Sequence, residues 1–224
     1  MPIDLRHPAP VVLDEDRLPD PVHVDHDERE RLLGLARAAV AVSARAADAA
    51  ELDAAYERAR ALGRCAAAFV TLTEEGELRG CMGSLDASRP VAESVLGAAT
   101  SAARRDPRFR PVLPGELPRI EIEVSVLGPL GALRDPELFR LGVDGIIVER
   151  GARRGLLLPE VAAMLAWDRT QMLETTCRKA GLPRDAWRAA GTTVYAFRTD
   201  RFGGPAVSPT AERPAGEPSA DRSA

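Results

Sequence analysis

A single cysteine lies between two glycines in the segment LRGCMG at residues 78–83. Glycine lacks a Cβ, so Gly80 and Gly83 allow positive φ and let a ligand approach the backbone N–H groups. Arg79 places a guanidinium beside the thiol of Cys81, which favours the thiolate and can hold a carboxylate or phosphate. The pattern predicts a reactive cysteine at a site that binds an anionic substrate. The alternative is that Cys81 packs in the core, because free cysteine is among the most buried residue types.

A strictly alternating strand supplies a candidate general base. Residues 120–126 read IEIEVSV, so one side of the strand is apolar and the other carries two carboxylates and a hydroxyl. If Glu123 faces a cleft, partial burial raises its pKa towards that of a general base, whereas on an open surface it is simply solvated. Asp106 and Asp144 are the other acids that could serve Cys81 as base or contact its substrate.

The histidines exclude the commonest way of activating a thiol. His7, His23 and His26 are the only three, and all precede the predicted core, so a Cys–His pair or a histidine-ligated metal inside the domain is unavailable. His23 and His26 could clip a metal as a short HVDH segment, but metal sites need three or four ligands in fixed geometry. The chain also lacks CxxxCxxC, GxGxxG and P-loop patterns. We therefore expect neither a metal nor a cofactor.

Lys179 is the only lysine among 30 basic residues. Arginine cannot replace a compact or titratable ammonium, so a role in the site would explain why this lysine remains. Compositional drift is the alternative, and a lysine late in a helix also interacts favourably with the helix dipole. The candidate catalytic residues are thus Cys81, Glu123 and Lys179. The candidate substrate-binding residues are Arg79, Gly80, Gly83, Asp106, Arg108 and Asp144.

Several blocks of the chain together resemble one known family. LRGCMG is similar to the LRGCIG signature of the AMMECR domain family, whose bacterial members are often called AmmeMemoRadiSam system protein A. The resemblance extends over about residues 28–202. Met82 stands where the family usually has isoleucine and Asp144 where many members have histidine, so a role for that histidine cannot be carried over. The further blocks, in the expected order, are DPRF at 106–109, IEVSVL at 122–127, GVDG at 142–145, GLLLPEVA at 155–162 and CRKAGL at 177–182.

The resemblance implies an α+β fold with a large lobe, a small lobe and a cleft between them, and it brings no established reaction. The resemblance also implies that the protein acts together with a Memo-like protein and a radical SAM enzyme as partners. Two functions stay open. The protein is either an accessory enzyme or substrate-binding subunit with a cleft centred on Cys81, where Arg79 and Arg108 hold an anionic substrate. Or it is a non-catalytic binding or adaptor module for a small anion, a peptide or a partner protein.

Composition restricts the class of protein. With 224 residues and 45% hydrophobic content, the chain can bury one sizeable core. A net charge of -4 disfavours nucleic-acid binding, which needs clustered lysine and arginine. Three widely spaced cysteines indicate reduced thiols, and we find neither a signal-peptide pattern nor an apolar run near the ~20 residues of a membrane span. We expect a cytoplasmic protein with no membrane contact.

Hydrophobic patterning predicts an α+β fold in which helices pack on a mostly antiparallel sheet. Residues 1–26 contain five prolines and are expected to form an extended or partly disordered arm, residues 27–203 the domain, and residues 204–224 a disordered tail. The predicted helices cover residues 27–47, 52–62, 90–105, 169–180 and 183–190, with a further one beginning at Pro159. The predicted strands cover residues 66–73, 78–84, 120–126, 145–149, 155–158 and 193–198.

Overall fold

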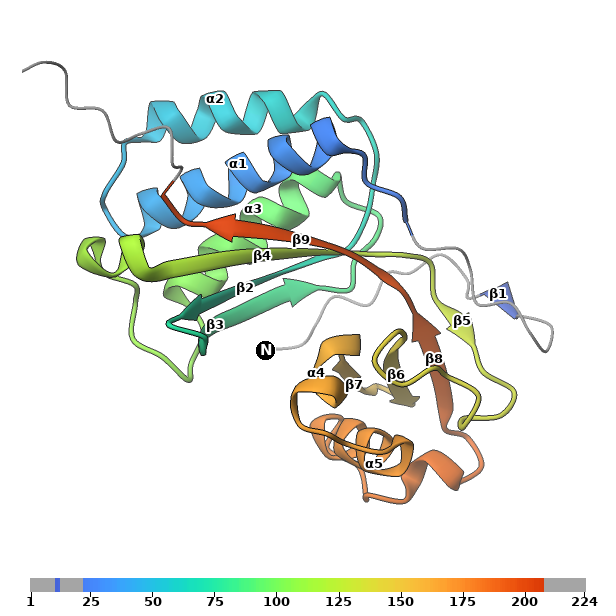
Figure 1. The fold of residues 1–224 in the computed structure, drawn as a ribbon. Helices are drawn as coiled ribbons and strands as arrows, with labels where there is room; N and C mark the ends of the chain where they lie inside the picture. The colour runs from blue at the N-terminus through green and yellow to red at the C-terminus, as the bar shows by residue number, and fades with distance from the viewer. Residues whose placement is uncertain (1–10, 13–21, 208–224) are drawn as a thin grey trace, which may run out of the picture.

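The protein is described by a computed structural model covering residues 11–12 and 22–207 (Figure 1). Its large lobe is a four-stranded antiparallel sheet in the order β3-β2-β4-β9, with helices α1, α2 and α3 on one side. The strands are β2 (Ala68–Glu74), β3 (Glu77–Ser84), β4 (Ile120–Leu127) and β9 (Thr199–Pro205). The helices are α1 (His26–Ser43), α2 (Ala49–Arg60) and α3 (Val91–Arg104), and a 3-10 turn, η1 (Pro114–Arg119), leads into β4.

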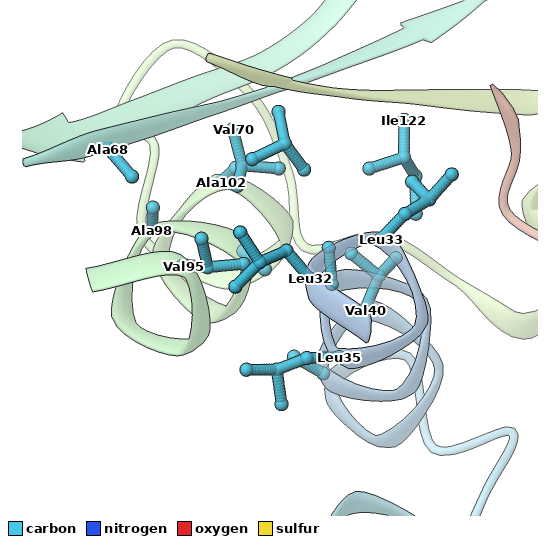
Figure 2. Close-up of a cluster of buried hydrophobic side chains, with 14 of the residues drawn as sticks. Leu32, Leu33, Leu35, Val40, Ala68, Val70, Val95, Ala98, Ala102 and Ile122 are labelled. Carbon is cyan, nitrogen blue, oxygen red and sulfur yellow. The ribbon is translucent and has the colours of Figure 1, made fainter. Parts of the chain in front are cut away.

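The core of the large lobe forms where α1 and α3 meet the apolar side of the sheet (Figure 2). Leu32 and Val40 of α1 approach the sheet beside Val95 of α3, and all are fully buried. Alternate residues of the central strands, such as Val70 and Ile122, point towards these helices. This is the packing expected of an amphipathic helix on a half-buried strand, since their apolar periods of 3.6 and 2 both select one side.

The small lobe is a second sheet in the order β1-β5-β8-β6-β7, antiparallel except for the pairing of β1 with β5. Helix α5 packs on β7 and β6 over a core that includes Phe139, Ile146 and Met172. The strands are β1 (Val11–Val12), β5 (Gly131–Ala132), β6 (Gly145–Arg150), β7 (Arg153–Leu157) and β8 (Thr193–Phe197). The helices are α4 (Pro159–Met164) and α5 (Arg169–Lys179), followed by the 3-10 turn η2 (Ala186–Arg188).

The two lobes are joined by a shared strand path and by apolar contacts. Only Arg198 separates β8 from β9, so the chain passes directly from the small sheet into the large one (Figure 1). A third apolar cluster contains Leu85 and Leu127 from the large lobe together with Ile147 and Phe197 from the small lobe. Because these side chains are buried, the lobes meet through a packed surface.

The α+β fold and its mostly antiparallel pairing are confirmed. The helix expected over residues 183–190 is not formed, and this segment contains only the short 3-10 turn η2. The last strand was missed: β9 runs to Pro205, two residues into the range expected to be tail, and Ala206 is buried. Most of the expected arm and residues 208–224 lie outside the described residues. Across the part of the chain that is described, every helix is too short or too polar to cross a membrane.

Candidate functional site

One extra residue in β3 decides which way Cys81 faces. Near the turn β3 pairs regularly with β2, but the register then shifts by one, which leaves Arg79 as a bulge. In an unbulged hairpin Cys81 would lie opposite Val70, whose side chain is buried against the helices. With the bulge it lies opposite Thr71, on the other side of the sheet. A bulge re-aims the side chains that follow it, and here it turns the thiol away from the helical core.

The side of the large sheet that faces away from the helices carries two rows of residues, and we call it the lobe-facing side. Directly paired residues of antiparallel strands project to the same side, so each row can be read from the strand register. Arg201, in the second row, forms an ion pair with Glu160 of α4 in the small lobe. The first row is Cys81, Thr71, Glu123 and Gly203, and the second is Gly83, Phe69, Ser125 and Arg201.

Asp106 fixes both the backbone of Cys81 and the side chain of Arg108. Its carboxylate is 1% exposed and accepts hydrogen bonds from Cys81 N at 2.9 Å and from Arg108 N, Nε and Nη2 at 3.1, 2.9 and 2.6 Å. The bonds from the Arg108 side chain, helped by those from the two backbone N–H groups, outweigh burial and lower its pKa to about 2. Arg108 also donates to Cys81 O at 3.3 Å. Its side chain is 53% exposed, and its Nη1 makes no hydrogen bond to any described residue.

The thiol of Cys81 is not activated in the way that the sequence suggested. Burial raises its pKa, and the opposing effects of Thr71, Arg108 and Lys179 do not overcome it. Thr71 Oγ1 donates to Cys81 Sγ at 3.3 Å. The expectation of a lowered pKa is therefore wrong, because partial burial in the sheet outweighs the nearby positive charges.

Arg79 is committed elsewhere, which corrects its predicted role beside the thiol. Its Nε and Nη2 donate to Glu116 at 2.8 and 3.2 Å, and its side chain is only 13% exposed. Glu116 also accepts from Leu113 N at 2.6 Å, and the bonds from Arg79 lower its pKa. The bulged arginine thus ties β3 to η1 through Nε and Nη2, while its Nη1 is buried without a hydrogen-bond partner among the described residues.

The two glycines of the motif are explained by close packing, since neither has positive φ. A Cβ on Gly80 would lie 2.5 Å from Ala102 O in α3, and one on Gly83 would overlap the Phe69 ring. The expectation of left-handed backbone at these positions is wrong. The missing side chains let a helix and an aromatic ring approach β3, so packing rather than a ligand explains why these two positions are glycine.

Glu123 shares one arginine with a second carboxylate. Arg201 lies 3.5 Å from Glu123 Oε2 and 3.5 Å from Glu160 Oε2. Burial raises the pKa of Glu123, Glu160 raises it further, and Arg201 opposes both. The direction is the one expected of a partly buried carboxylate, and its use as a general base stays a prediction.

Lys179 reaches the neighbourhood of Cys81 from the other lobe. It is the last residue of α5. This helix lies so close to β7 that a Cβ on Gly155 would overlap the backbone of the helix. Lys179 as a residue is exposed, yet nearby protein atoms displace water from its ammonium, and this desolvation lowers the pKa of Lys179. Arg108 lowers this pKa further, whereas Cys81 raises it. Among the described residues, no carboxylate forms an ion pair with this ammonium. Cys81 and Lys179, which the sequence had singled out separately, thus act on each other electrostatically.

Asp144 interacts with Arg140 and Arg198, and within the described residues it makes no contact with Cys81. Its carboxylate is fully buried in the small lobe, where it accepts from Arg140 N at 2.7 Å and lies 3.4 Å from Arg140 Nε and Arg198 Nε. These contacts hold the turn before β6 against the junction of β8 and β9. They assign Asp144 a structural role, in place of the predicted contact with substrate.

Sequence reasoning missed Thr71, Ser125, Glu160 and Arg201. Glu160 lay within the block GLLLPEVA, and Ser125 was visible in the alternating strand, but neither had a partner to suggest a role. The other two depend on register and on β9, which the sequence did not indicate. The HVDH segment belongs to the start of α1, where Asp25 and Glu28 form a capping box. Within the described residues, no group of three or more His, Cys, Asp or Glu could hold a metal ion.

Comparison with known proteins agrees with the motif blocks. The model of the AMMECR1 family matches residues 33–202. The chain belongs to the AMMECR1 family. A protein of Methanothermobacter thermautotrophicus is 49% identical over 140 residues, covering 60% of this chain and 73% of that protein. A protein of Aeropyrum pernix is 38% identical over 188 residues, covering 80% of each chain.

A solved AMMECR1-like structure supports the fold as well. The crystal structure of uncharacterized protein PH0010 from Pyrococcus horikoshii aligns with a TM-score of 0.74 and 34% identity. The alignment covers 81% of this chain and 95% of that chain. The predicted family is therefore confirmed, while these relatives carry no named activity that could be compared with the group around Cys81.

Proposed function

We propose that this AMMECR1-family protein is a substrate-binding subunit or accessory enzyme that holds a small anionic substrate beside Cys81, in a cleft between the two lobes. The observation that supports the proposal is that Arg108 of the large lobe and Lys179 of the small lobe both act electrostatically on this thiol and lower its pKa, and that Arg108 also donates to Cys81 O. Arg108 is neutralised by Asp106, but no described carboxylate pairs with Lys179. One positive charge is therefore available to a ligand.

Binding is favoured over nucleophilic attack by the state of the thiol. Because burial raises the pKa of Cys81, the neutral thiol predominates at physiological pH and can donate a weak hydrogen bond to a bound anion. The Asp106 contacts hold the Cys81 backbone and Arg108 in fixed relative positions, which reduces the ordering cost of binding. We further propose a Memo-like protein and a radical SAM enzyme as partners, and the resemblance to AmmeMemoRadiSam proteins is the support for this.

Alkylation with a charged and a neutral reagent tests the site without knowledge of the substrate. Iodoacetate is an anion and iodoacetamide is neutral, so the ratio of their rates at one thiol reports the local positive charge. We expect Cys65, which is exposed, to react fastest in absolute terms. The ratio of iodoacetate to iodoacetamide rates should nevertheless be several-fold higher at Cys81 than at Cys65, as read by peptide mass spectrometry.

The decisive variant is Lys179→Ala, which should bring the rate ratio at Cys81 down to about the value at Cys65. Arg178→Ala is the matched control, because Arg178 is the preceding residue of α5, is exposed and donates to Thr175 in its own helix. It should leave the ratio at Cys81 unchanged. Equal ratios at Cys81 and Cys65 in the unaltered protein would rule out the anion site.

A further inference from the structure

The lobe-facing side also carries an uncompensated negative charge. Glu123 and Glu160 share Arg201 at 3.5 Å each, so two carboxylates face one guanidinium. Arg201 is 42% exposed, while the Glu160 side chain is 16% exposed and comes from the small lobe. Lys179 has no paired carboxylate among the described residues, whereas Glu123 and Glu160 have one guanidinium between them, and Glu160 also raises the pKa of Cys81. Groups of both charges therefore surround Cys81 and Glu123 on the lobe-facing side.

Unsatisfied polar atoms mark the surroundings of Glu123 and Glu160 as a place for a ligand. Ser125 is 1% exposed, yet its Oγ has no hydrogen-bond partner among the described residues. It lies in the same row as Arg201 and two residues from Glu123 on β4, so it points to the lobe-facing side. Glu160 Oε2 is also buried and makes no hydrogen bond. Glu160 Oε2 still has its ion pair with Arg201, but the buried Ser125 hydroxyl has no partner among the described residues, and a ligand that donates a hydrogen bond would recover the free energy that this costs.

We propose that the substrate is zwitterionic, with its anionic group held by Arg108 and Lys179 and a protonated amine held by Glu123, Glu160 and Ser125. This rests on the proposed function, since it places the second end of the same ligand. Cys81, Thr71 and Glu123 stand side by side on three adjacent strands, so two strand spacings, about 10 Å, separate Cys81 from Glu123. A separation of this size suits an extended amino acid or a short peptide better than glycine.

A ladder of amino acids of increasing length tests the inference. Isothermal titration should give rising affinity from glycine through γ-aminobutyrate to ε-aminocaproate, as the amine comes within reach of Glu123. Caproate lacks the amine and hexylamine lacks the carboxylate, so both serve as matched probes. We expect ε-aminocaproate to bind about tenfold more tightly than caproate, which is the gain typical of one charge-assisted hydrogen bond. Glu123→Gln should abolish this advantage.

Glu121→Gln is the control, because Glu121 is an exposed carboxylate two residues earlier on the same side of β4. It should retain the advantage of ε-aminocaproate. Caproate that binds through Lys179 with no gain from the amine would overturn the zwitterion while leaving the anion site intact. An amine advantage that survives in Glu123→Gln would also overturn it. If caproate fails to bind and the alkylation ratio at Cys81 is flat, the anion site itself is refuted.

Discussion

The two sides of the large sheet are built from the same strands but do different work. Towards the helices, Val70 and Ile122 are almost fully buried, and α3 lies so close that Gly80 has no room for a side chain. Away from the helices, the neighbouring positions carry Cys81 and Glu123, on which Glu160 of the small lobe acts electrostatically. A one-residue step along a strand therefore separates the residues that stabilise the fold from those that could bind a ligand.

Truncating adjacent residues of β4 gives the largest expected contrast between the two sides. Ile122→Ala should lower the free energy of unfolding by about 2–5 kcal/mol, because it leaves a cavity under α1. Glu123→Ala should cost less than about 1 kcal/mol, since its ion pair is long and partly exposed. Urea denaturation measures both. Equal losses would show that Glu123 is held for stability.

A pH titration of stability tests the pairing of Asp106 with Arg108 and with the backbone of Cys81. Its pKa falls from 3.8 unfolded to about 2 folded, so the folded state binds fewer protons. The resulting stabilisation, about 2 kcal/mol, is fully present above about pH 5 and is lost as the pH falls from about 4 through 2. The free energy of unfolding, measured by urea denaturation across this range, should follow that decline.

Asp106→Asn isolates this contribution, because the amide keeps the shape of the side chain but cannot ionise. The variant should be less stable at neutral pH and should lose the acid-dependent part that Asp106 supplies. Glu77→Gln is a suitable control, since Glu77 is exposed at the start of β3. Identical acid profiles for the unaltered protein and Asp106→Asn would contradict the pairing of Asp106 with Arg108.

The sequence predicted the helices, the strands and the apolar side of the sheet because those depend on local periodicity. The alternation over 120–126 placed Ile122 and Glu123 on opposite sides of one strand, and the structure agrees. Strand β9 was missed because Gly204 and Pro205 lie in the range expected to be tail and the residues before them show no alternating apolar pattern. Its position is set by pairing with β4, which no local pattern records.

The site was only partly predictable for the same reason. Residue type and motif context singled out Cys81, Asp106 and Arg108, which are in contact. The orientation of the thiol depends on the bulge at Arg79, and its partner Thr71 depends on the resulting register. The bulge also directs Arg79 to Glu116, so the nearest arginine in sequence does not supply the charge. Arg108 and Lys179, both further along the chain, are the cations that act on the thiol instead.

The smallest expected effect on stability is at Lys179, where a substitution should change ligand binding while leaving stability almost unchanged. Lys179→Ala should cost only about 0.3–1 kcal/mol through the helix dipole, and Lys179→Arg should cost less, because arginine keeps the charge at the end of α5. Thermal unfolding measures this. Caproate binding should nevertheless fall in both variants, since a guanidinium does not reproduce a compact ammonium beside Cys81. Full recovery of binding in Lys179→Arg would show that only charge matters there, and that this lone lysine remains through compositional drift.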